Sequence, residues 1–250
     1  MSSALPSANR WRSNLEVLVF LLGLGVLIHK SQLPDALTTP WPFLTTAFAV
    51  AALWRPGSRF VAYGLVAAVI TEILWFWPYV VNHQAYLLFA GLIMLLSMVR
   101  ISGSSGTSED HIELESHLFP ALRTGVYALF TFAVLHKLNH GSLNPDVSCA
   151  VSHYETFADR LAMFPTPNST SSRRALIYGT LIGEAAIPVL LYFRRSRTLG
   201  LGVAFVFHFL MGINGHQAFS GFSPALYVPF LPPRFHELLA AHVRAFRQQR

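Results

Sequence analysis

The sequence predicts an all-α membrane protein, a polytopic transmembrane helical bundle of eight spans or seven. Hydrophobic residues make up 53% of the 250 residues and charged residues only 12%, which is about half the charged fraction of a typical soluble domain. The deficit is local, because Glu72 is the only formally charged residue among the forty that separate Arg59 from Arg100. That stretch is long enough for two bilayer spans of about 20 residues each.

Eight apolar segments follow one another along the chain, and prolines lie at several of their boundaries, where helices are expected to begin or end. The second and the eighth are short, so we expect them to be tilted or re-entrant. The first follows Arg10 and Arg12 and has no A-x-A cleavage pattern after it, which favours an uncleaved span. The segments cover residues 14–29, 42–54, 60–79, 85–100, 119–137, 175–193, 198–214 and 220–232.

The basic residues predict the orientation of these spans. With a cytoplasmic N-terminus and eight spans, thirteen of the eighteen lysines and arginines fall on the cytoplasmic side, in line with the positive-inside rule. Both termini are then cytoplasmic, as an N-terminal segment at 1–13 and a basic tail at 234–250. The transmembrane domain covers 14–233, with a polar linker at 101–116 and a non-cytoplasmic loop at 138–174. In this loop, "YETFADRLAMF" is expected to form a short amphipathic helix.

The composition also indicates the class of partner. The net charge of +6 comes from arginines, with only two lysines, Lys30 and Lys137. Arginines beside apolar runs are typical of membrane topology rather than of nucleic-acid binding. We therefore expect the lipid bilayer as the partner, in a bacterial inner membrane or an ER-type membrane, and no nucleic acid. The single cysteine, Cys149, excludes an intrachain disulfide.

Lys137 is the most unusual polar residue of the chain. It ends the apolar segment 119–137, and the predicted topology places it on the non-cytoplasmic side, as it does the loop that contains Asn82 and His83. One interpretation is a lysine at a helix end that extends its ammonium to the lipid headgroups. The other is a base, because a buried lysine can lose its proton whereas an arginine stays charged.

Other ionisable residues lie inside apolar segments or beside Lys137. An unpaired carboxylate at Glu72 or Glu184 would be costly, so each is expected to be protonated or hydrogen-bonded across helices. His208 is more simply explained by packing against a neighbouring helix. His136 and His140 have the H-x-x-x-H spacing that places two imidazoles on one helix face and suggests an iron site. The sequence has no second such box, so we expect no metal.

Three blocks of sequence, in order, resemble a known membrane family. They are "VVNHQAYLLFAGLIMLL" (80–96), "FAVLHKLNHGSLNPDVSCA" (132–150) and "RRSRTLGLGVAFVFHFLMGINGHQAFSGFSPALY" (194–227). Together they are similar to the horizontally transferred transmembrane (HTTM) family, which includes the vitamin K-dependent gamma-glutamyl carboxylases. The likeness extends over residues 12–233.

The resemblance implies a lyase-type reaction on a lipid-soluble quinone. Lys137 would be the catalytic base that deprotonates reduced vitamin K or menaquinol, with Asn82 and His83 beside the quinone. Dioxygen and carbon dioxide would be co-substrates, and a glutamate of a protein substrate would be carboxylated while the quinone leaves as its epoxide. No metal is implied. The residues expected to contribute to substrate binding are His208, Glu184, His136 and His140.

The resemblance is incomplete, which leaves other functions open. The carboxylases carry a large luminal domain that helps to bind the protein substrate, and we expect no such domain in a chain of 250 residues. We therefore expect hydroquinone oxidation to be retained more readily than protein carboxylation. Two alternatives stay open at this point. One is a non-enzymatic membrane protein or subunit that binds a quinone or lipid, and the other is a histidine-box metal enzyme.

Overall fold

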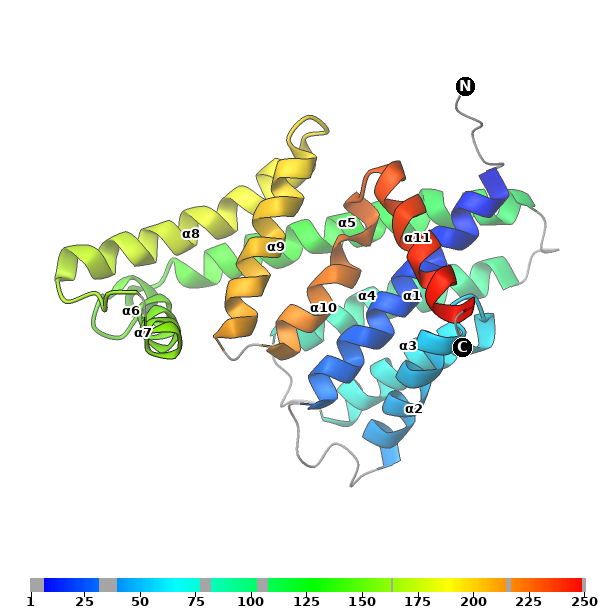
Figure 1. Cartoon of the computed structure of the whole chain (residues 1–250), viewed down its shortest axis with the longest axis horizontal. Coiled ribbons are helices and arrows are strands. Elements are labelled where there is room, and N and C mark those ends of the chain that lie inside the picture. The colour runs from blue at the N-terminus through cyan, green and yellow to red at the C-terminus, as the bar shows by residue number, and fades with distance from the viewer. Residues whose placement is uncertain are drawn as a thin grey trace. The chain divides into compact units, whose positions relative to one another are not determined.

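The computed structural model describes residues 7–31, 40–76, 82–102, 108–162, 164–214 and 217–248. All regular structure in these ranges is helical, which confirms the all-α prediction, and every one of the eight apolar segments overlaps a helix. The elements are α1 (Ser7–Ser31), α2 (Pro40–Trp54), α3 (Arg59–Trp75), α4 (Asn82–Ser102), α5 (Ser108–Lys137), α6 (His140–Leu143), α7 (Cys149–Leu161), α8 (Thr170–Tyr192), α9 (Arg197–Ile213), α10 (Gln217–Tyr227), the 3₁₀ turn η1 (Val228–Phe230) and α11 (Pro233–Gln248) (Figure 1).

Serines cap the N-terminal ends of two of these helices. At α3, the Ser58 hydroxyl accepts a hydrogen bond from the Val61 amide at 3.4 Å. At α8, Ser169 and Ser172 form a reciprocal capping box, in which each hydroxyl accepts from the backbone amide of the other residue, at 3.1 and 3.2 Å. Such caps satisfy amides that have no partner inside the helix, so they fix where these two apolar helices begin.

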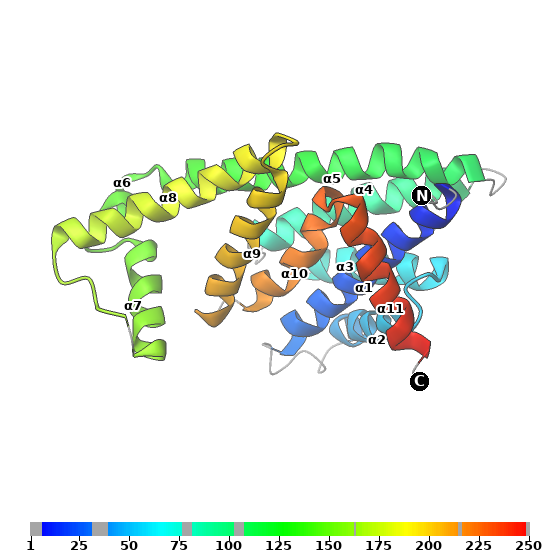
Figure 2. The same cartoon turned by 45° about the horizontal axis from the view of Figure 1, so that its top comes forward.

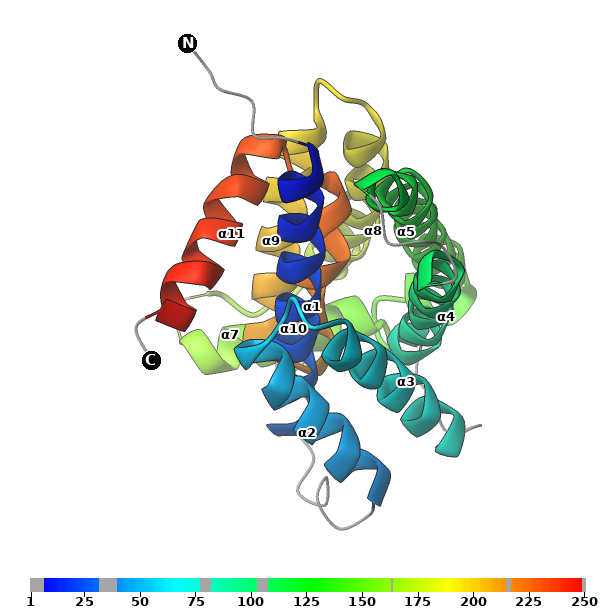
Figure 3. The same ribbon diagram turned by 90° about the vertical axis from the view of Figure 1, so that its right-hand side faces the viewer.

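The chain divides into two compact units, with the boundaries inside α5 and α10. The first unit comprises Met1–Gly125 and Gly221–Arg250. In it, α1 contacts α2 and α11, α2 contacts α3, and α3 contacts α4, and Figure 3 shows α11 alongside α1. Gly23 lets α1 and α2 approach closely, since a Cβ there would lie 2.9 Å from the Ala49 carbonyl oxygen. Small residues at helix contacts are typical of membrane bundles.

The second unit, Val126–Ser220, contains the C-terminal part of α5 and helices α6 to α9. Here α8 packs against α9 and α7, and α8 runs in the opposite direction to the adjoining part of α5 (Figure 2). Gly200 allows the turn between α8 and α9 to close, because a Cβ at this position would lie 2.9 Å from the Leu191 amide nitrogen. At Gly202 on the same helix, a Cβ would meet nothing within 4 Å.

Two helical stretches in the described ranges are long and apolar enough to cross a membrane, Ser116–Lys137 and Thr170–Tyr192. Large apolar side chains on the outside of the second unit agree with this, since Phe132 is 70% exposed, Ile182 67% and Phe209 68%. Soluble proteins rarely expose apolar side chains in such number. Length, composition and exposure therefore favour association with a membrane.

Two segments that the sequence marked only as polar are helical. The expected linker 101–116 contains the end of α4 and the first nine residues of α5, Ser108–Ser116. The expected tail at 234–250 forms most of α11, which packs against α1. The amphipathic helix expected in the 138–174 loop is present as α7, and it begins earlier, at Cys149. Polarity alone therefore did not mark the ends of the helices.

Candidate functional site

Lys137 forms an ion pair with Glu184 in the second unit. Its ammonium nitrogen Nζ donates hydrogen bonds to both carboxylate oxygens, Oε1 and Oε2, each at 2.8 Å. The glutamate side chain is 7% exposed and the lysine side chain 27%. Lys137 is thus directed to a buried carboxylate, which differs from the snorkelling interpretation, and Glu184 is bonded across helices as expected.

The antiparallel arrangement of α5 and α8 brings these two side chains together. Lys137 is the last residue of α5, and Glu184 lies in the interior of α8. Nearer the other end of the contact, the Tyr127 hydroxyl of α5 donates to the Leu191 carbonyl of α8 at 3.4 Å. Residue 127 of α5 therefore lies near residue 191 of α8, and residue 137 of α5 lies near residue 184 of α8. Two polar contacts fix the register that places the amine at the carboxylate.

The two histidines beside Lys137 do not share a helix. His136 lies in the last turn of α5, whereas His140 begins the separate short helix α6, and both are exposed. Asn139 separates them and caps α6, since its Oδ1 accepts from the Ser142 amide at 2.9 Å. The expectation that the H-x-x-x-H spacing places both imidazoles on one helix face is therefore wrong, and the histidine-box alternative loses its geometric basis.

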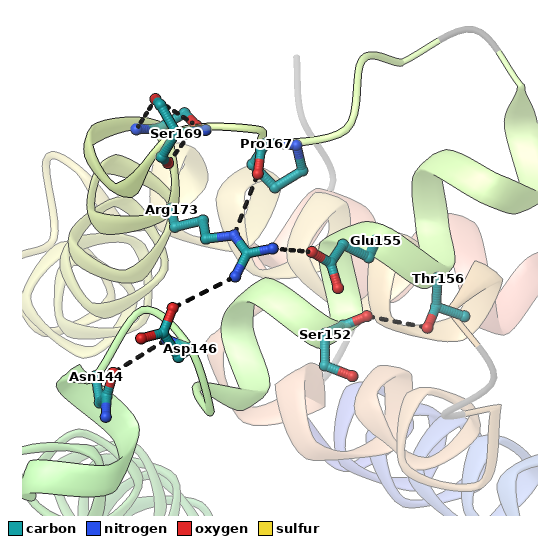
Figure 4. Close-up of polar contacts among 9 residues, drawn as sticks. Asn144, Asp146, Ser152, Glu155, Thr156, Pro167, Ser169 and Arg173 are labelled. Carbon is teal, nitrogen blue, oxygen red and sulfur yellow. Dashed lines mark hydrogen bonds and ion pairs between the residues drawn. The ribbon is translucent and has the colours of Figure 1, made fainter.

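The segment after α6 is held by a network around Arg173, at the start of α8. Figure 4 shows its guanidinium between an aspartate, a glutamate and a backbone carbonyl. It donates to the Pro167 carbonyl and to the Glu155 carboxylate, each at 3.2 Å, and lies 3.7 Å from the Asp146 carboxylate. These contacts join the 144–148 turn, α7 and α8, and so support the part of the chain that follows Lys137.

The helix α7 is also held at the C-terminal end of α9. Arg160 donates to the Ile213 carbonyl at 2.6 Å, and the Asn214 side-chain amide donates to the His153 carbonyl at 2.6 Å. The described residues of the 138–174 loop are therefore joined to both α8 and α9 within the second unit.

His208 is buried in the same unit, at 2% exposure. Its ring meets the Phe130 ring edge-on, with centroids 6.3 Å apart. Phe130 precedes Lys137 by seven residues on α5, which corresponds to about 10 Å along a helix axis. His208 therefore packs about two turns away from the Lys137–Glu184 pair, and its predicted role in substrate binding stays a prediction.

Asn82 and His83 are the first residues of α4. Their side chains lie outside the described residues. The prediction that they lie beside a quinone at Lys137 therefore stays a prediction.

A second lysine–glutamate pair, which was not predicted from the sequence, joins Lys30 and Glu72 in the first unit. Lys30 Nζ donates to Glu72 Oε1, and these side chains are 6% and 11% exposed. Both lysines of the chain therefore pair with a glutamate from the interior of an apolar helix. The sequence did contain one sign of this second pair, since the dipeptide His-Lys occurs in the last turn of α1, at 29–30, and again in the last turn of α5, at 136–137.

No family model, curated protein or solved structure matches the chain.

Proposed function

We propose that the chain is a multi-pass integral membrane protein of eight spans or seven, and that its Lys137–Glu184 pair takes a proton from a lipid hydroquinone. The topology is supported by the eight apolar segments, each overlapping a helix, and by the bias of the basic residues. One observation carries the site: the Lys137 ammonium lies 2.8 Å from both oxygens of a carboxylate that is 7% exposed.

This geometry makes a proton exchange inside the pair straightforward. The charged pair and its neutral form, an amine beside a carboxylic acid, differ by the transfer of one proton over a single hydrogen bond. The proposed reaction uses the neutral form. It leaves a lone pair on Lys137 Nζ, while Glu184 stores the proton.

The hydroquinone would then be deprotonated by the neutral amine. Its hydroxyl gives a proton to Lys137, and the ammonium that forms stabilises the adjacent hydroquinone anion. Glu184 stays protonated in this step, so the only charges that develop are the ammonium and the anion beside it. With dioxygen as the oxidant implied by the resemblance, one hydroquinone and one dioxygen give one quinone epoxide and one water, which balances all atoms and the four electrons that dioxygen accepts.

A lipid substrate has an apolar approach to this position. Leu135 and Leu138, on either side of Lys137 in sequence, are 56% and 53% exposed, and Phe132 is 70% exposed. In a bilayer these side chains would contact acyl chains, from which a hydroquinone could diffuse to the partly exposed lysine. Carboxylation of a glutamate with carbon dioxide is a further step, for which a protein substrate would be required.

Oxygen uptake by the reconstituted full-length protein tests this proposal. Reduced menaquinone or reduced vitamin K is supplied in vesicles, and the wild type is compared with Lys137→Arg, which keeps the positive charge. We expect the variant to lose turnover by a factor of 100 or more, in the range typical for loss of a general base. Lys30→Arg is the matched control, because it makes the same change in the other pair and should keep oxygen uptake.

Each outcome has a definite meaning. Full oxygen uptake by Lys137→Arg would show that Lys137 is not the base. If the wild type binds the reduced quinone and consumes no oxygen, the chain is a binding protein or a subunit and the enzymatic proposal is wrong. Stoichiometric iron in the purified protein would instead support the metal-enzyme alternative.

A further inference from the structure

The Lys30–Glu72 pair differs from the Lys137–Glu184 pair in one respect. Lys137 binds both oxygens of its glutamate, whereas Lys30 binds only Oε1 of Glu72. The other oxygen, Glu72 Oε2, is buried and has no hydrogen-bond partner among the described residues. A buried carboxylate oxygen without a donor is costly, so this atom indicates that something else binds there.

A small cavity of about 30 Å³ borders this pair. A water molecule requires roughly 10–15 Å³ of such volume and two to four polar partners, so the cavity has room for one or two. Its wall includes His29 and Lys30 from α1, Thr45 from α2, Glu72 from α3 and Gln84 from α4. The remainder of the wall is apolar.

The polar groups of this wall can complete a hydrogen-bonded site. Thr45 is 2% exposed, and its hydroxyl donates to the Trp41 carbonyl at 3.0 Å, which leaves its oxygen lone pairs available as acceptors. Among the described residues that line the cavity, the titratable groups are His29, Lys30 and Glu72, and the helices α2, α4 and α10 contribute none. A proton that enters can therefore reside on a carboxylate, an amine or an imidazole.

We propose that Lys30, Glu72 and His29 form a second proton-exchange site, in which water held in the cavity delivers a proton to Glu72 Oε2. The ligand is thus water as the proton carrier rather than a metal ion or an organic molecule. Protonation of Oε2 turns an oxygen without a donor into a donor toward the cavity, and it leaves the Lys30 contact to Oε1 in place. The site lies in the first unit and does not depend on hydroquinone chemistry at Lys137.

Infrared difference spectroscopy of the purified full-length protein in lipid nanodiscs tests this proposal. The spectrum at acidic pH minus the spectrum at alkaline pH should contain the carbonyl stretch of a buried carboxylic acid, because this acid forms as the pH falls. We expect this band to be lost in Glu72→Gln and kept in Glu184→Gln, which removes the other buried carboxyl group. Lys30→Met, which removes the counter-charge, should shift the appearance of the band to higher pH, because an unpaired buried carboxylate takes up a proton more readily.

Two further measurements keep the proposal falsifiable if Glu72→Gln folds poorly. The double variant Lys30→Met with Glu72→Gln removes both charges, and we expect it to fold and to lack the band. Thr45→Val keeps the shape of the side chain and removes a polar group from the cavity wall, so it should slow hydrogen–deuterium exchange of the Glu72 acid. A band that survives in the double variant, exchange unchanged by Thr45→Val, or a spectrum that responds to sodium rather than to pH would overturn the proposal.

Discussion

Exchange of the two charged residues at Lys137 and Glu184 separates a structural ion pair from a catalytic lysine. The double variant Lys137→Glu with Glu184→Lys keeps one positive and one negative side chain at the contact and moves the amine to the other helix. A structural pair should tolerate this exchange. A base that must meet its substrate from the end of α5 should not.

The magnitudes follow from the distance and the burial. At 2.8 Å the attraction is about 6 kcal/mol for an effective dielectric constant of about 20, and desolvation of the two charges offsets several kcal/mol of it. Lys137→Met leaves the Glu184 carboxylate, 7% exposed, without a counter-charge, and we expect a cost of about 3 kcal/mol. Glu184→Gln should cost only about 1–2 kcal/mol, because Lys137 is 27% exposed and can turn its ammonium to water.

Thermal unfolding in detergent, followed by circular dichroism, measures these effects. For a chain of this length, about 3 kcal/mol corresponds to a decrease of roughly 6–12 °C in Tm. We expect Lys137→Met to be less stable than Glu184→Gln. We expect the double exchange to recover at least half of the stability that its two single variants, Lys137→Glu and Glu184→Lys, lose together.

Oxygen uptake is measured on the same double variant and provides the decisive comparison. We expect the exchanged pair to recover stability without recovering turnover. If turnover returns with stability, the position of the amine is unimportant and the catalytic assignment is refuted. If stability does not return, the 2.8 Å contact is not the interaction that stabilises this part of the fold.

Two further predictions use matched neighbours as controls. Gly200→Ala should destabilise the protein by about 1–3 kcal/mol through overpacking against α8. Gly202→Ala, with open space around it, should change Tm little. Thermal unfolding of the two variants measures the difference. Arg173→Ala should weaken the order of the 144–167 segment by about 1 kcal/mol and increase its cleavage by protease, whereas Arg174→Ala, an exposed neighbour, should leave the cleavage rate unchanged.

The positions of the helices could be predicted from the sequence because hydropathy is a local property. Each apolar run of the chain overlaps a helix, and the polar loop around "YETFADRLAMF" contains the expected short helix α7. Hydropathy did not mark the helical stretches that are polar. Residues 108–116 and 234–248 are helical although polar, and α11 is stabilised in part by packing on α1, a contact between opposite ends of the sequence.

The candidate site could be predicted only in part, since its partners lie on different helices. Lys137 and Glu184 were each recognised as costly residues, but they are 47 positions apart, and only the register of α5 against α8 makes them a pair. The same limit applies to Lys30 and Glu72. The H-x-x-x-H spacing does not place the two histidines on one helix face, because α5 ends at Lys137 and His140 begins α6.

The choice between lysine and arginine in this chain follows the kind of contact that each makes. Arg173 binds exposed or half-exposed acidic groups and a backbone carbonyl, a contact in which a permanent charge with several donors is an advantage. The two lysines instead pair with glutamates that lie inside apolar helices. A guanidinium cannot give up its proton in a protein, whereas an ammonium can. Conservative replacement by arginine at Lys137 should therefore keep the ion pair and abolish the proton exchange proposed there, whereas at Lys30 it should keep the ion pair and leave the protonation of Glu72 Oε2 in place.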